Sequence, residues 1–61
     1  GVGIELRLLG CNPDKAEMRA EKYGFKVISK SQDKPHGLRE CYIIDNSGYC
    51  WVPCEYLQLN N

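Results

Sequence analysis

A long apolar run is absent from this sequence of 61 residues, which excludes a membrane-spanning helix and the apolar region of a secretory signal. Net charge is also absent, because eight Lys and Arg residues balance eight Asp and Glu residues. The pI is near 6.7, whereas a dedicated nucleic-acid-binding domain usually has a pI above about 9. We therefore expect a cytoplasmic protein that does not bind a membrane and for which nucleic acid is not the favoured partner.

Catalytic motifs are scarce as well. The single histidine, His36, falls in a polar stretch, where we expect a solvated loop with Asp33 as the nearest carboxylate. The sequence contains no C-x-x-C motif, no phosphate-binding glycine loop and no Cys–His pair. A chain of this length buries only about 60% of the surface exposed by its unfolded form, which leaves no room for a deep substrate cavity. We therefore predict a protein that is not an enzyme and has no cofactor, and we assign no catalytic residues.

The sequence alone does not decide whether the four cysteines are thiols, disulfides or metal ligands. In a secreted protein Cys11, Cys41, Cys50 and Cys54 would form two disulfides with three possible pairings, whereas in the cytosol they would be thiols. The one close pair is Cys50-x3-Cys54, which lacks the spacing of a zinc site. We favour free thiols, with Cys41 and Cys50 buried as small apolar side chains, and we predict no metal site.

The first half of the chain predicts a strand followed by a short helix. Apolar and charged residues alternate over 4–9, which is typical of a half-buried strand. Asn12 can then cap a helix and Pro13 suits its first position, so we expect a helix over 14–22 that ends at Gly24. The apolar content of this helix is low, and it must therefore lie against a sheet.

The second half predicts only strands and turns. After a second strand over 25–28 and a polar loop over 31–37, the residues Asn46-Ser47-Gly48 suit the turn of a hairpin. Further strands are expected over 38–45, 49–52 and 57–59. Pro53 cannot donate a hydrogen bond and is expected to end its strand. The sequence therefore predicts a mostly β single domain over residues 1–61, a small five-stranded barrel with one short helix in its first long connection.

The run from Val52 to Leu59, V-P-x-x-Y-L-x-L, resembles the closing element of SH3-type barrels. The segments K-Y-G-F-K-V and D-N-S-G-Y are also similar to those of small SH3-fold proteins of bacteria and their phages. The resemblance implies an SH3-like barrel, and it places Pro53 and Tyr56 where peptide-binding members of the family hold proline-rich ligands. The family's first aromatic segment and its tandem tryptophans are absent, so the resemblance does not imply binding of P-x-x-P peptides.

Side-chain alternation in the hairpin suggests a surface for a partner. In the predicted register Ile44 lies opposite Cys50 and Ile43 lies opposite Trp51. If Val52 points inward, Trp51 points outward and forms an exposed apolar strip with Ile43; alternatively, the helix folds across this face and Trp51 belongs to the core. Exposed aromatic side chains are effective anchors for a partner. The predicted partner-binding residues are Ile43, Tyr49, Trp51, Pro53 and Tyr56.

Three functions follow, in order of preference. The first is a protein-interaction module, for example a phage-type inhibitor or adaptor that binds a larger host protein. The second is a small barrel associated with nucleic acid, in which aromatic side chains stack on bases and Lys22, Lys26 and Lys30 contact phosphates. The third is a thiol-based redox or metal-binding protein, in which Cys11 near the helix start has a lowered pKa.

Overall fold

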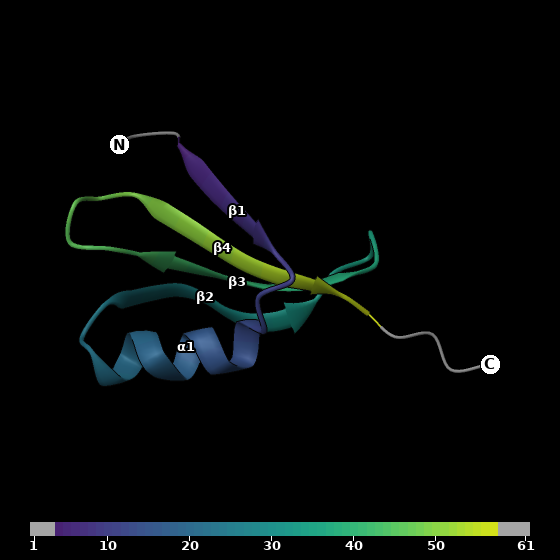
Figure 1. The fold of residues 1–61 in the computed structure, drawn as a ribbon, viewed down its shortest axis with the longest axis horizontal. Coiled ribbons are helices and arrows are strands. Elements are labelled where there is room, and N and C mark those ends of the chain that lie inside the picture. The colour runs from purple at the N-terminus through teal and green to yellow at the C-terminus, as the bar shows by residue number, and fades with distance from the viewer. Residues whose placement is uncertain (1–3, 58–61) are drawn as a thin grey trace.

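The computed structural model describes residues 4–57, which form four strands and one helix (Figure 1). The elements in chain order are β1 (Glu5–Leu9), α1 (Pro13–Lys22), β2 (Lys26–Asp33), β3 (Leu38–Ile44) and β4 (Cys50–Tyr56). Strands predominate, and the helix occupies the first long connection as expected.

The four strands form one sheet in the order β1-β4-β3-β2. The hairpins make β2–β3 and β3–β4 antiparallel, whereas the connection through α1 returns the chain so that β1 lies parallel to β4. A closed barrel requires the two outermost strands to pair with each other, but β1 and β2 remain the two edges of this sheet. The predicted five-stranded SH3-like barrel is therefore wrong in its strand number and in its closure.

β4 is longer than the sequence predicts. It continues through Pro53 to Tyr56, so the expectation that Pro53 ends its strand is wrong. Proline removes one hydrogen-bond donor, but β4 pairs with β3 on one side and with β1 on the other, and these ladders hold the strand together. Leu57 follows β4 outside any strand, and the remainder of the predicted last strand, 58–59, lies outside the described residues.

β2 is also longer than expected and includes the first part of the predicted loop. It extends to Asp33, with shifts of register between Val27 and Ser29 and between Ser29 and Gln32. The polar residues that suggested a loop are compatible with this strand because it is an edge of the sheet.

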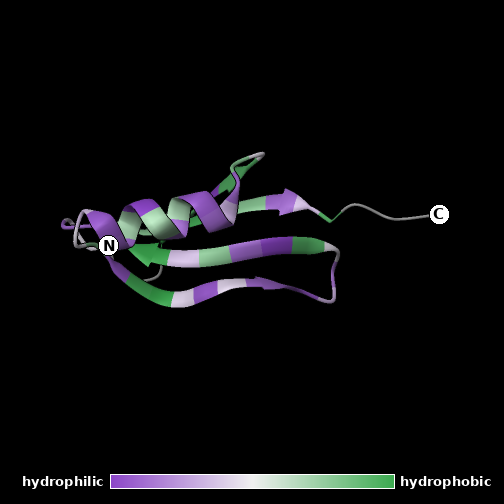
Figure 2. Ribbon diagram, turned by 90° about the horizontal axis from the view of Figure 1, so that it is seen from below, coloured by the Kyte–Doolittle hydropathy of each residue, from purple (hydrophilic) through white to green (hydrophobic). Residues whose placement is uncertain are grey.

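The helix forms where its capping residues predict it. The side chain of Asn12 accepts a hydrogen bond from the backbone N–H of Lys15, Pro13 is in the first turn, and Gly24 follows with a φ of 81°. Hydrophilic and hydrophobic segments alternate along α1 in Figure 2. Its apolar side packs on one face of the sheet, where the core consists of Ala20, Cys41 and Ile43 with Ala16, Phe25 and Val27 against them.

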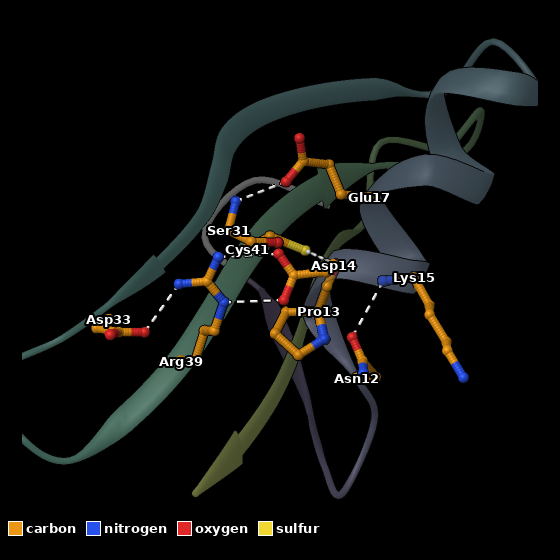
Figure 3. Close-up of polar contacts among 9 residues, drawn as sticks. All are labelled: Asn12, Pro13, Asp14, Lys15, Glu17, Ser31, Asp33, Arg39 and Cys41. Atoms are coloured by element: carbon orange, nitrogen blue, oxygen red, sulfur yellow. Dashed lines mark hydrogen bonds and ion pairs between the residues drawn. The ribbon is translucent and has the colours of Figure 1, made fainter. Parts of the chain in front are cut away.

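Polar contacts fix α1 on the sheet (Figure 3). The guanidinium of Arg39 in β3 donates two hydrogen bonds of 2.9 Å to Asp14 in α1 and one of 2.8 Å to Asp33 in β2. Glu17 of α1 accepts a hydrogen bond of 2.7 Å from the backbone N–H of Ser31. These contacts connect the helix to β2 and β3, and they lower the pKa of Asp14 and Glu17.

The hairpin of β3 and β4 has the predicted register. Ile44 pairs with Cys50 and Ile43 pairs with Trp51. Gly48 has a φ of 86°, which confirms the left-handed position expected for this turn.

Candidate functional site: a groove between the helix and the first strand

The helix does not cover the whole of its face of the sheet. α1 contacts β2, β3 and β4, but within residues 4–57 it does not reach β1. A groove of about 440 Å³ with almost entirely apolar walls remains between the helix and the β4–β1 side of the sheet. Its lining residues are Leu8, Ala16, Arg19, Ala20, Tyr23, Phe25, Ile43, Asp45, Trp51 and Pro53.

The turn of the hairpin holds Trp51 in this groove. The indole N–H of Trp51 donates a hydrogen bond of 2.7 Å to Oδ2 of Asp45. The other carboxylate oxygen, Oδ1, accepts hydrogen bonds of 2.9 Å and 3.0 Å from the backbone N–H groups of Ser47 and Tyr49. The indole first, and then the backbone donors, hold the pKa of Asp45 below its usual value. The ring of Trp51 is therefore oriented before any partner binds.

The predicted exposed strip of Trp51 and Ile43 requires correction. Both side chains point to the face on which α1 lies, so Ile43 is only 7% exposed, Trp51 is half-buried and Pro53 is buried. These three residues nevertheless line the same groove. Tyr49 and Tyr56 are 39% and 71% exposed and are not among the lining residues. The structure thus brings three of the five predicted residues together.

Sequence reasoning did not assign seven of the ten lining residues to a site, among them the large apolar side chains of Leu8, Tyr23 and Phe25. Tyr23 is 67% exposed at the end of α1, and Phe25 is half-buried just before β2. A signal for Tyr23 was available, because it continues the spacing of Ala16 and Ala20 along one side of the helix. Leu8 could not be found in this way, because its neighbours depend on the pairing of β1 with β4.

An ion pair that the sequence did not suggest lies on the other face of the sheet. Glu40 is only 2% exposed, and its Oε2 accepts a hydrogen bond of 2.5 Å from Nη1 of Arg7. The same nitrogen is 3.9 Å from Sγ of Cys54. Glu40 raises the pKa of Arg7 and thereby stabilises its charged form. The buried carboxylate of Glu40 thus links β3 to β1, and the same guanidinium nitrogen contacts β4 between them.

His36 also lies near this carboxylate. Its Nε2 is 3.6 Å from Oε1 of Glu40, so the expectation that Asp33 is its nearest carboxylate is wrong. The short turn before β3 places His36 four residues before Glu40 and above the same face. Residues 4–57 contain no group of three side chains able to hold a metal ion.

The lysines of the nucleic-acid hypothesis lie on two elements. The ammonium of Lys22, at the end of α1, lies 5.8 Å from the centre of the Tyr23 ring. Lys26 and Lys30 are at exposed positions of β2. Their contact with phosphates stays a prediction.

All four cysteines are free thiols, as favoured from the sequence. Cys41 and Cys54 are fully buried, Cys50 is half-buried and Cys11 is exposed. The thiol of Cys41 donates a hydrogen bond of 3.4 Å to the carbonyl oxygen of Pro13, and burial raises its pKa and that of Cys50. In the part of the chain that the structure describes, no helix has the length and apolar character needed to cross a bilayer.

No family model matches this sequence, and no curated protein sequence matches it. Among solved structures, the chain is similar to the crystal structure of TioX from Micromonospora sp. ML1, with a TM-score of 0.75 and 28% sequence identity. The similarity covers 88% of this chain but only 44% of TioX, so the chain spans less than half the length of that protein. The similarity supports a small β-sheet domain, and it does not confirm the resemblance to SH3-type barrels.

Proposed function

We propose that this chain is a non-enzymatic protein-interaction module, which receives an apolar side chain of a protein partner in the groove between α1 and β1. The observation that carries the proposal is the composition of the groove, whose mostly apolar lining includes three aromatic side chains, those of Tyr23, Phe25 and Trp51. Aromatic side chains at interfaces bury a large area while they lose little conformational entropy. A role as a phage-type inhibitor or adaptor of a larger host protein would use this same groove.

The side chain of Tyr23 accounts for much of the expected affinity. It is 67% exposed, and an aromatic side chain offers roughly 150–250 Å² in total. At about 25 cal/mol per Å², covering its exposed part contributes roughly 2.5–4 kcal/mol. Trp51 contributes less new area but supplies a rigid wall, since Asp45 already holds its indole.

The test uses peptides selected from a random library on the immobilised protein. Each selected peptide is titrated against the protein while the fluorescence of Trp51, the single tryptophan, is recorded. The variant Tyr23→Lys should bind the peptides at least about tenfold more weakly, because it loses most of the contact area. The matched control is Met18→Lys, which places the same charge at a helix position that is 70% exposed and outside the groove lining.

The result for Met18→Lys should equal that for the unmodified chain. The proposal is refuted if the selection enriches no peptide, or if the enriched peptides bind Tyr23→Lys as tightly as the unmodified protein. Circular dichroism of both variants verifies that the sheet and helix are retained.

A further inference from the structure

The free edge of β1 is a second surface without a partner within residues 4–57. β1 and β2 are the two edges of the sheet, and they differ in character. β2 has two register shifts and carries Lys26 and Lys30 at exposed positions, and such features discourage pairing with another strand. β1 pairs with β4 without any shift over its five residues and contains neither Lys nor Pro. Only one edge of this sheet is therefore protected.

The backbone of β1 presents hydrogen-bonding groups at this edge. The N–H of Gly10 donates a hydrogen bond of 2.8 Å to the carbonyl oxygen of Cys54 in β4. Backbone groups of successive strand residues point to alternate sides. Counting back from Gly10, residues Leu9, Arg7 and Glu5 direct their N–H and C=O groups away from β4. The edge is thus a row of donors and acceptors suited to another strand.

We propose that β1 pairs with β1 of a second copy of this chain in an antiparallel arrangement centred on Leu6. The segment Ile4-Glu5-Leu6-Arg7-Leu8 complements itself about this centre. Glu5 of each copy lies opposite Arg7 of the other, Ile4 lies opposite Leu8, and Leu6 lies opposite Leu6. Opposite charges that face each other across two strands are stabilising, and apolar pairs likewise.

Charge and side-chain direction select this register. A register centred on Arg7 would place the two Arg7 side chains opposite each other, and like charges in that position are destabilising. Registers displaced by one residue would turn the leucines to the opposite face of the sheet. The side chain of Arg7 is 42% exposed, and its contacts with Glu40 and Cys54 both use Nη1, so the guanidinium is accessible to Glu5 of the second copy.

The pairing would join two four-stranded sheets into one continuous sheet. It would place Ile4 of the second copy, which is 49% exposed in the single chain, beside Leu8 in the wall of the groove. More than half of TioX lies outside the part similar to this chain, which is enough length for a second unit of the same size. The pairing does not depend on a partner in the groove.

The first test is sedimentation equilibrium of the chain over a range of concentrations. The unmodified chain should form a dimer, and Glu5→Lys should weaken it by about tenfold or more, because two attractive pairs become repulsive. Glu21→Lys makes the same charge change at an exposed position of α1 and should leave the dimer constant unchanged. Tyr23→Lys should also leave it unchanged, which separates this inference from the proposed function.

The second test fixes the register. In a chain carrying Cys11→Ser, the variant Leu6→Cys should form an intermolecular disulfide on mild oxidation, because residues at the centre lie within bonding distance across the pair. Arg7→Cys should cross-link much less. A monomer at all concentrations, or faster cross-linking of Arg7→Cys than of Leu6→Cys, would overturn the proposal.

Discussion

Replacing Arg7 by Met removes the ion-pair partner of Glu40, a carboxylate that is only 2% exposed. Breaking a buried ion pair from one side costs about 3–5 kcal/mol, because a charge is left buried without compensation. Here the side chain of Arg7 is 42% exposed, and solvent screening reduces the expected cost to roughly 2–3 kcal/mol. For a domain of this size, that loss lowers the melting temperature by roughly 10–20 °C.

A double-mutant cycle with Glu40→Gln isolates the pair. The glutamine keeps the shape of the side chain but removes its charge, so Arg7→Met should cost less than about 1 kcal/mol in this background. Thermal unfolding followed by circular dichroism provides the free energies, at a protein concentration at which every variant is monomeric. Lys15→Met removes one positive charge at an exposed position of α1 and serves as the control.

The coupling energy decides the outcome of this cycle. A value above about 1 kcal/mol indicates that Arg7 stabilises the fold through the carboxylate of Glu40. If Arg7→Met has the same effect in the unmodified chain and in the Glu40→Gln background, or if it is as harmless as Lys15→Met, the ion pair contributes nothing and the reasoning is refuted.

Two further predictions concern the thiols and the response to acid. A thiol reagent should modify Cys11 rapidly and Cys41 only after unfolding, because Cys41 is fully buried and burial raises its pKa; equal rates for the two would contradict the burial. The pKa of Asp45 is lowered in the folded state, so its stabilising contribution is present above the unfolded value of about 3.9 and is lost as the pH falls through the folded value. The fluorescence of Trp51 should therefore change in this acid range, and Asp45→Asn should abolish that change; an identical titration of the variant would show that another group is responsible.

Local chemistry was sufficient to predict α1 and the second hairpin. The helix begins after Asn12 and ends before Gly24 because side-chain capping and a left-handed glycine act within a few residues. The β3–β4 register follows in the same way from Gly48 and the residues around it. Each of these features depends on residues that are neighbours in the chain.

Closure of the sheet depends on residues far apart in the chain, and the sequence did not predict it correctly. Two conditions decide it: whether Pro53 ends its strand, and which strand lies beside β1. Pro53 remains within β4 because that strand is paired on both sides, through Leu8 in β1 among others. No local pattern reveals that β1 pairs in parallel with the last strand, and the barrel was predicted from the expected five short strands and from a short resemblance.

The burial of Ile43 also depends on residues far apart in the chain, and the sequence did not predict it. Alternation correctly assigned Ile43 and Trp51 to one face, but it could not say which face the helix covers. β3 and β4 are buried on both sides, with Cys41 and Ile43 under the helix and Val52 and Cys54 on the other face. Strands buried on both faces lose the contrast between apolar and polar positions on which such reasoning depends. In the edge strand β1 the contrast between charged and apolar positions persists. The register of a strand that pairs with β1 can therefore be inferred from its sequence.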